Sequence, residues 1–508
     1  MTAPRRHPRA RLAGALLLCL GALTACSQEG ELESPSTSPA APISSAPELG
    51  TPGDGGTSAG PGAPAPTPPR NDPREWVVSP GGSDSAAGSS AAPFRSIAKA
   101  VSVVGPGERI TVKAGTYAEP VSLSGSVRDG TAAAPIRLQG EGRPVIVPSG
   151  SSVLVAISKA WWEVDGFEVD VKGQAKFAVA FTGNTQGSRL SGSDVHHGSL
   201  GGGITTYANA TGAIIENNDI HHFTRSGQDS HGVVVQPTSK NITIRNNRIH
   251  DNTGDAVQCI GPEGFSSLPP ADGVVIQGNE MFTNFENAVD IKTCHNVKVQ
   301  GNVMRDYGTY GGCAVVVHMS ARDVLLEDND IFNVGKAIAI GGNHEGPVPT
   351  RVLVRRNRIR NVRKASGLDG DAIRLENSES AQVVNNTMVD VGNAGIRVGG
   401  GTGGATSNLS VYNNIVQAAV ALHVGTQAPG LKLGANLYAP SSTVNSAGST
   451  LSLSAWLSQG KDPGSVEAAP QLPADGFTPG SNAIDRGREV GLPFCGAAPD
   501  IGAVETGC

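Results

Sequence analysis

Aromatic and charged residues are both scarce in this chain of 508 residues. Phe, Trp and Tyr make up 4% of it and charged residues 17%, whereas glycine is abundant, at 67 residues. So few rings argue against a globular core built on large side chains and favour a narrow interior of Val, Ile, Leu and Asn. The formal net charge of −6 disfavours nucleic acid as a partner.

The cysteines lack the CxxC and Cys/His spacings typical of a zinc site. Cys495 and Cys508 bracket the C-terminal end, and in an oxidising compartment they could close a small loop. Three more, Cys259, Cys294 and Cys313, lie in the middle of the chain. Because three is an odd number, we expect at least one of them to be a small buried hydrophobic residue.

The N-terminus has the organisation of a secretion signal. Arginines at 5–11 precede a short apolar run at 12–23, too short for a stable membrane-spanning helix. The run ends in Leu23-Thr24-Ala25-Cys26, which resembles a bacterial lipobox and implies cleavage before Cys26 and a lipid on its sulfur. An ordinary cleaved signal is the alternative. We therefore expect a signal peptide at 1–25 and a secreted bacterial lipoprotein, anchored in a membrane at the cell surface or in the periplasm.

Residues 26–72 are rich in Pro, Ser and Gly and contain almost no large apolar side chains. Such a segment cannot bury enough surface to fold, so we expect a disordered tether.

A phrase of alternating apolar and polar residues that ends in asparagine recurs through the middle of the chain. From Asn218 to Asn414, the intervals between the asparagines are 29, 32, 23, 27, 28, 29 and 28 residues. A period of this length marks a repeat architecture, and the alternation with abundant Gly and Asn favours strands over helical repeats. Two or three short strands per coil predict a parallel β-helix, with the asparagines forming an inward-facing amide ladder.

Both ends of the repeat region carry further motifs. These are Glu75–Asp84, Pro93–Ile97 and Ala114–Tyr117 at one end, and Ser481–Asp485 and Asp500–Glu505 at the other. With them the chain resembles the right-handed β-helix family to which pectate lyases belong. The resemblance implies an all-β, right-handed parallel β-helix over 73–508. It also implies an N-terminal cap at about 73–130 with a short capping helix, and a closing segment at about 440–508.

Stacking the second strand phrase of each coil in register predicts one polar face. Val233/Val235, Val257/Cys259, Val289/Ile291 and their successors point inward, and the residues between and after them point outward. Asp290, Lys292 and His318 then converge on one side of a coil that presents only Ala339 and Gly341. Arg374, Glu376 and Arg397 lie on its other side, which leaves a gap of about 10 Å for a sugar ring.

Other polar residues extend this face: Tyr207, Gln236 and Gln258 lie on earlier coils, and His231, Asp255 and Asn287 form an adjacent column where the strands begin. Five histidines elsewhere, at 196, 197, 221, 222 and 250, follow the Asn turns and are interpreted as surface or satisfied turn residues.

The residue types on this face favour β-elimination on a uronate. Lys292 or His318, with Asp290 beside them, could remove the proton α to the carboxylate. Arg374 and Arg397 could hold that carboxylate through their planar guanidinium groups. Glu376, Gln258, Gln236, Tyr207 and His231 are the other expected substrate contacts. Glycoside hydrolysis is disfavoured, because no pair of carboxylates has the required separation.

The phrase Glu286-Asn287-Ala288-Val289-Asp290 is similar to the acidic phrase that binds calcium in family 9 polysaccharide lyases. The similarity implies Ca²⁺ held by Asp255, Glu286 and Asp290, with Asn287 in place of the second acid of the family phrase.

Together these features predict a lipid-anchored polysaccharide lyase, monomeric, that acts on an acidic polysaccharide. A non-catalytic β-helix that binds glycans or serves as an adhesin is the alternative, and a glycoside hydrolase is the second alternative.

Overall fold

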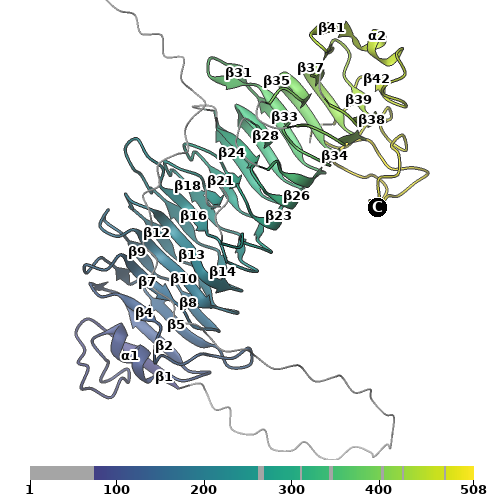
Figure 1. Ribbon diagram of the computed structural model, residues 1–508. Coiled ribbons are helices and arrows are strands. Elements are labelled where there is room, and N and C mark those ends of the chain that lie inside the picture. The colour runs from purple at the N-terminus through teal and green to yellow at the C-terminus, as the bar shows by residue number, and fades with distance from the viewer. Residues whose placement is uncertain are drawn as a thin grey trace, which may run out of the picture. The chain divides into compact units, whose positions relative to one another are not determined.

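The structure, a computed structural model, describes residues 74–260, 268–308, 312–342, 347–401, 405–425, 428–473 and 476–508. The predicted signal, tether and lipidated Cys26 lie outside these residues. Short parallel strands follow one another along the chain and stack from coil to coil, as Figure 1 shows. We describe them as three sheets, of which the second and third are joined into one of 26 strands. The first sheet contains β1 (Glu75–Val78), β2 (Arg109–Lys113), β5 (Ile136–Glu141), β8 (Trp162–Asp165), β11 (Arg189–Ser191), β14 (Ile214–Glu216), β17 (Thr243–Arg245), β20 (Val275–Gln277), β23 (His295–Gln300), β26 (Arg322–Glu327), β29 (Thr350–Arg355), β34 (Gln382–Val384), β36 (Ser410–Tyr412) and β38 (Lys432–Gly434).

The second and third sheets join where β35 (Thr387–Val398) and β37 (Ile415–Val424) run through both. The second also contains β3 (Thr116–Tyr117), β6 (Val145–Ile146), β9 (Glu168–Asp170), β12 (Asp194–His196), β15 (Asp219–His221), β18 (Arg248–His250), β21 (Glu280–Phe282), β24 (Val303–Tyr307), β27 (Asp330–Val334), β30 (Arg358–Val362), β39 (Leu437–Tyr438) and β42 (Val466–Glu467). The third also contains β4 (Val121–Leu123), β7 (Val153–Ile157), β10 (Phe177–Asn184), β13 (Gly202–Thr211), β16 (His231–Val235), β19 (Val257–Cys259), β22 (Val289–Ile291), β25 (Cys313–Val317), β28 (Lys336–Gly341), β33 (Asp371–Glu376), β40 (Thr443–Ser446) and the antiparallel β41 (Ser449–Ser452).

The sheets enclose one narrow hydrophobic core along the whole solenoid. The prediction of an all-β, right-handed parallel β-helix is confirmed. The predicted inward positions, such as Val233, Val257 and Val289, are fully buried and stand in register on successive coils. Most of this core is aliphatic, because each coil covers the core of the next, and buried rings such as Trp162, Phe223 and Tyr307 lie among the aliphatic side chains.

The asparagine ladder is also present. Asn302, for example, donates from Nδ2 to Asn329 Oδ1 at 3.0 Å and to the Ile276 carbonyl at 2.9 Å. Its own Oδ1 accepts from the backbone N–H and the Nδ2 of Asn279. The same pattern links nine buried asparagines: Asn218, Asn247, Asn279, Asn302, Asn329, Asn357, Asn386, Asn414 and Asn436.

The turn that aims each ladder side chain inward depends on the residue before it. That residue is left-handed at several of these turns, with φ of 58° at Asn217, 56° at Asn246 and 63° at Gly301. Asn, Asp and Gly tolerate this conformation better than other residues, which accounts for the repeated Asn-Asn, Asp-Asn and Gly-Asn pairs.

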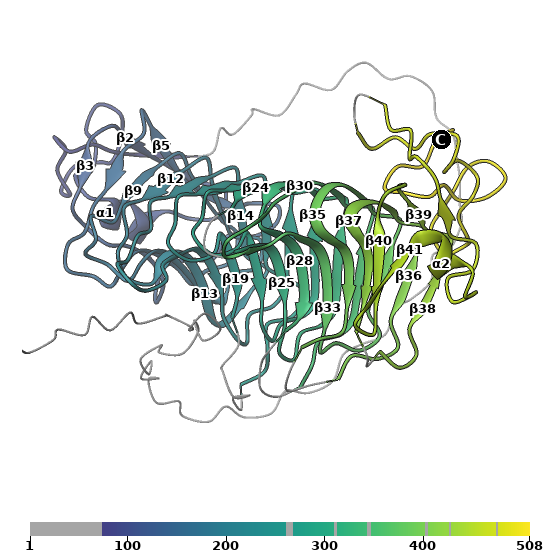
Figure 2. The same cartoon turned by 90° about the horizontal axis from the view of Figure 1, so that it is seen from above.

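Each end of the solenoid carries a short helix, as both views show (Figures 1 and 2). The predicted N-terminal capping helix is α1 (Ile97–Val103); Ser96 caps it by accepting from the Lys99 N–H, and Ile97, Ala100 and Val101 are buried. The sequence did not predict α2 (Leu453–Leu457) near the C-terminal end.

Two disulfides are present. Cys495–Cys508 closes the predicted C-terminal loop, and Cys259–Cys294 links two buried cysteines of adjacent coils. Cys313 is a free, buried thiol, as expected for one of the three central cysteines.

Candidate functional site

The third sheet carries the predicted polar face in the predicted register. Gln258, Asp290 and Val316 are partners on adjacent strands β19, β22 and β25. Ala339 pairs with Arg374 and Gly341 with Glu376 between β28 and β33, and Arg374 then pairs with Arg397 on β35. The face therefore runs without a break from Gln258 to Arg397.

The structure differs from the expectation in exposure, because several residues that point away from the core are nevertheless buried. Lys292 is 3% exposed, Asp290 5% and Gln258 1%. Neighbouring coils stand only about 4.8 Å apart, so long side chains in one column cover each other.

The centre of the face is a pair formed by His318 and Asp290. His318 Nε2 donates to Asp290 Oδ1 at 2.8 Å across adjacent coils. Burial alone would raise the pKa of Asp290, but the charges of His318 and Lys292 and the hydrogen bond from His318 hold that pKa below its usual value. Asp290 is therefore ionised, and its contact with Nε2 orients the His318 ring.

A second group lies where the strands β16, β19 and β22 begin. Asp255 is fully buried; its Oδ1 accepts from Asn287 Nδ2 at 2.8 Å and its Oδ2 from Gln258 Nε2 at 3.0 Å. The backbone N–H of Asp255 donates to His231 Nδ1 at 2.9 Å. Ligand atoms of His231, Asp255 and Glu286 all lie within 4.8 Å of one another.

This group has the properties of a cation site. Burial, with the charges of Asp255, Asp229 and Asp290, raises the pKa of Glu286 to about 10. Among the described residues, the buried Gln258 Oε1 has no hydrogen-bond partner. Carboxylate and amide oxygens are the donors that a hard divalent cation such as Ca²⁺ prefers, so the residues fit one. Two predicted ligands, Asp255 and Glu286, come together here, whereas the third, Asp290, pairs with His318.

The two predicted carboxylate-binding arginines each have acidic partners within the chain. Arg374 donates from Nη1 to Asp369 Oδ2 and from Nη2 to Glu376 Oε1, both at 2.6 Å. Arg397 donates from Nε to Asp371 Oδ2 at 2.7 Å. A substrate carboxylate at either guanidinium would therefore share it with a protein carboxylate.

Asp369, Asp371 and Lys336 were not predicted as part of this site. Two of them could have been found, because the column of His231, Asp255 and Asn287 continues through Cys313 to Lys336 and Asp371. Asp369 could not, since it lies in the hairpin of β31 (Lys364–Ala365) and β32 (Leu368–Asp369), which the repeat does not predict. Lys336 Nζ meets Asp369 Oδ2 at 2.7 Å.

The remaining predicted contacts lie on earlier coils. Gln236 is half-buried and donates from Nε2 to Thr205 Oγ1 at 2.9 Å. Tyr207, at the end of the same face on β13, is half-buried. Among the described residues, no hydrogen bond joins Gln236 or Tyr207 to Asp290 or His318.

Comparison with known families supports the architecture. Residues 164–268 and 267–416 match the family described as right handed beta helix region. The chain is a right-handed parallel β-helix protein. Residues 80–122, at the N-terminal cap, match a family described as a protein of unknown function, DUF1565. A comparison with curated proteins gave no match.

Solved structures of the same fold have different activities. The PL6 family alginate lyase AlyGC has a TM-score of 0.55 at 15% identity, over 79% of this chain and 54% of that one. Pectate lyase Pel9A has a TM-score of 0.41 at 19% identity, over 85% and 96%. PfbA, a surface adhesin of Streptococcus pneumoniae, has a TM-score of 0.45 at 14% identity, over 70% and 89%. At these identities the likeness shows the fold alone.

Among the described residues, none of the helices is long and apolar enough to cross a membrane.

Proposed function

We propose that the chain is a carbohydrate-active enzyme that cleaves a uronic-acid polymer by β-elimination on the third sheet, between β22 and β35. The observation that carries the proposal is the hydrogen bond of 2.8 Å from His318 to the ionised Asp290, beside Lys292. Across β28, which presents only Ala339 and Gly341 at these positions, Arg374 and Arg397 supply positive charge.

In this proposal His318 Nδ1 or the Lys292 amine takes the proton α to the substrate carboxylate. The electron pair of that C–H bond forms the C4–C5 double bond, the bond from C4 to the glycosidic oxygen breaks, and the leaving oxygen takes up a proton. Arg374 and Arg397 stabilise the charge that develops on the carboxylate during the transfer. A divalent cation held by Asp255 and Glu286 would supply further positive charge to this face.

The test is an assay of the purified chain on pectate, alginate and glycosaminoglycans, with and without Ca²⁺. Elimination gives an unsaturated uronate, which absorbs in the ultraviolet and is visible as a new product. We expect this product from one of the polymers, and a loss of at least about 100-fold in kcat for the variant of the true base. Absence of product across the panel, with and without Ca²⁺, would contradict the proposal.

Variants separate the two possible bases. His318→Ala and Lys292→Ala each remove one candidate, and His295→Ala removes a half-buried histidine of the first sheet as a matched control. If neither His318→Ala nor Lys292→Ala lowers a measured activity, the site is placed wrongly even though the reaction is right.

A glycan-binding or adhesive role is the second candidate, and the burial of the site favours it. Lys292 and Asp290 are 3% and 5% exposed, and both arginines are already paired with carboxylates. This role predicts saturable binding of an acidic polysaccharide with no unsaturated product.

We also propose that Cys26 carries a lipid that anchors the chain to a membrane, supported by the sequence Leu23–Cys26. Incorporation of labelled palmitate in a bacterial host should occur in the wild type and be absent in Cys26→Ser.

A further inference from the structure

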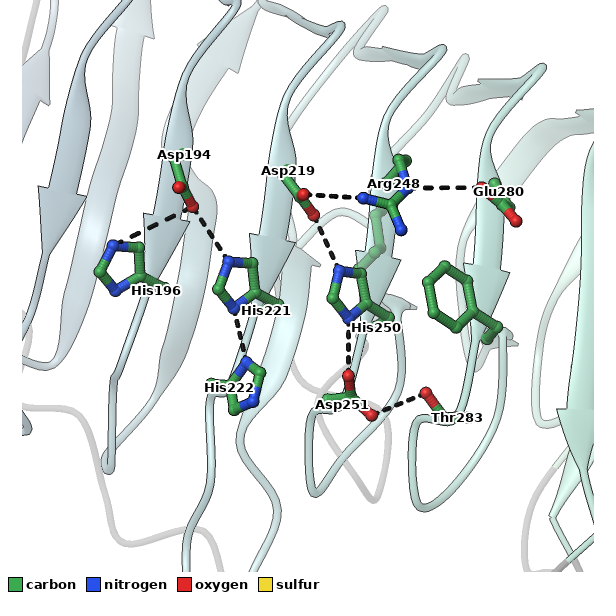
Figure 3. A network of polar contacts seen from close by, with 12 residues as sticks. Asp194, His196, Asp219, His221, His222, Arg248, His250, Asp251, Glu280 and Thr283 are labelled. Atoms are coloured by element: carbon green, nitrogen blue, oxygen red, sulfur yellow. Dashed lines mark hydrogen bonds and ion pairs between the residues drawn. The ribbon is translucent and has the colours of Figure 1, made fainter. Parts of the chain in front are cut away.

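A second polar cluster lies on the outer side of the second sheet, away from the proposed active face. Three successive strands end in related phrases, Asp194–His197, Asp219–His222 and Arg248–Asp251. The strand register aligns His196 with His221 and His221 with His250. Figure 3 shows these three rings side by side, one on each strand.

Stacking explains only part of this cluster. The rings of His196 and His221 are 5.3 Å apart at 12°, and those of His221 and His250 5.1 Å apart at 13°. Such a column is ordinary packing between coils, and Phe282 continues it beyond His250. The sequence interpretation of these histidines as satisfied turn residues describes this column adequately.

In two of the three phrases a second histidine follows directly, His197 after His196 and His222 after His221. His197 and His222 are left-handed, with φ of 59° and 57°, and this turn folds each ring back on the histidine before it. As a result, His196 Nδ1 and His197 Nδ1 are 2.6 Å apart, and His221 Nδ1 and His222 Nδ1 are also 2.6 Å apart. Only one proton can lie between two such nitrogens, so each pair directs at least one lone pair at the shared space.

Among the described residues, the first pair also has a carboxylate beside its two Nδ1 atoms. Asp170, the register partner of His196 on β9, places Oδ1 3.7 Å from His196 Nδ1 and 3.6 Å from His197 Nδ1. A point about 2 Å from all three atoms therefore exists, which is the distance of zinc from imidazole and carboxylate ligands. In the second pair, the position of Asp170 is occupied by His196.

The surroundings of His196 resemble those of a metal ligand. Its Nε2 faces acidic groups, with Glu168 Oε1 at 3.5 Å and Asp194 Oδ1 at 4.0 Å. Carboxylates at the second nitrogen commonly orient a ligating imidazole and increase its basicity. His197 is 58% exposed, so the fourth coordination position would be open to solvent.

We propose that Asp170, His196 and His197 bind a divalent transition-metal ion of the Zn²⁺ type. Two imidazole nitrogens with one carboxylate favour such an ion over Ca²⁺ or Mg²⁺, which prefer oxygen ligands. Three protein ligands and an open fourth position give the ion room for water or an incoming ligand. This site is separate from the residues of the proposed lyase function and does not depend on it.

The test is calorimetric titration of the full chain with Zn²⁺, after treatment with a chelator. We expect saturable binding that weakens more than about tenfold in His197→Ala and in Asp170→Asn. His222→Ala is the matched control, because it removes the same residue type from the neighbouring pair, and it should retain the binding. Glu286→Gln removes a ligand of the other candidate cation site, so it should retain this binding as well.

Spectroscopy provides a second measurement. Co²⁺ in place of Zn²⁺ should give the intense visible bands of a four-coordinate ion in the wild type and in His222→Ala, and lose them in His197→Ala. His197 is exposed, so this variant should fold, and circular dichroism would check that it does. Absence of saturable binding in the wild type would overturn the proposal. Equal binding by the wild type and His197→Ala, or equal loss in His222→Ala, would also overturn it.

Discussion

Asn302 shows how a single side chain contributes to the stability of several coils. It makes hydrogen bonds to three neighbours, Ile276, Asn279 and Asn329, and is 1% exposed. Replacement by alanine would leave buried donors and acceptors on both sides without partners, and each costs about 1–3 kcal/mol. We therefore expect Asn302→Ala to lower the free energy of unfolding by roughly 3 kcal/mol or more.

Chemical denaturation would measure this loss. Asn184→Ala is the control, since Asn184 is exposed at the end of β10 and its side chain accepts a single hydrogen bond, from the Gln186 N–H. A similar small effect of both variants would show that the ladder contributes little to stability.

His250 allows a prediction about pH. Burial opposes its charge, but hydrogen bonds to Asp219 and Asp251 raise the pKa of His250 above its usual value. A group whose pKa is raised on folding stabilises the fold fully below its unfolded pKa, about 6.5, and loses that contribution as the pH rises through the folded value. His250→Gln should therefore lower Tm more at about pH 5.5 than at about pH 8.5.

His295 provides the opposite case. Burial and the charge of Arg322 lower the pKa of His295, so its protonation works against the fold. His295→Gln should raise Tm relative to the wild type at low pH, where the unfolded chain binds the extra proton. If both substitutions change Tm in the same direction at low pH, these pKa shifts do not cause the dependence of stability on pH.

At the scale of elements, Gly341 at the end of β28 illustrates a constraint between strands. Its φ is 77°, and a Cβ at this position would lie 1.4 Å from the backbone carbonyl oxygen of Glu376 on β33. Gly341→Ala should therefore push β28 and β33 apart and lower the free energy of unfolding by about 3 kcal/mol or more.

Gly301→Ala is the matched control for that substitution. Gly301 has a φ of 63°, but no atom lies within 4 Å of the place that a Cβ would take, so it tests backbone strain without the clash. Its expected cost is only about 1 kcal/mol. Equal effects of the two variants, measured by denaturation, would contradict the role of the close approach.

The strands themselves could be predicted because each phrase carries its own alternation and ends at a turn residue. Gly341 was interpreted as leaving a gap for a sugar ring, whereas the structure shows that the contact with Glu376 also requires a glycine there. The hairpin of β31 and β32 interrupts the repeat. Its Asp369, which pairs with Arg374, therefore could not be predicted from the periodic pattern.

At the scale of the whole molecule, the C-terminal segment packs on the outside of the last coils. Ile501 and Ala483 form a small buried cluster with Ile415 and Leu437. The Asp500 carbonyl accepts from Asn385 Nδ2 at 2.9 Å. Truncation before residue 476 should therefore lower the free energy of unfolding by about 3 kcal/mol or more and speed amide exchange in β36 and β38. Unchanged exchange in these strands would contradict this role.

The coil, the register and the ladder follow from the sequence alone, because they depend on local alternation and on turn residues that recur at each repeat. The sequence therefore predicts Asp290, Lys292 and His318 on one face with Arg374 and Arg397. The pairing and burial of these side chains, by contrast, depend on the folded structure. Whether Asp290 contacts His318, whether Arg397 contacts Asp371, and whether the rings of His196 and His197 meet depends on side-chain directions across coils, which no single repeat encodes.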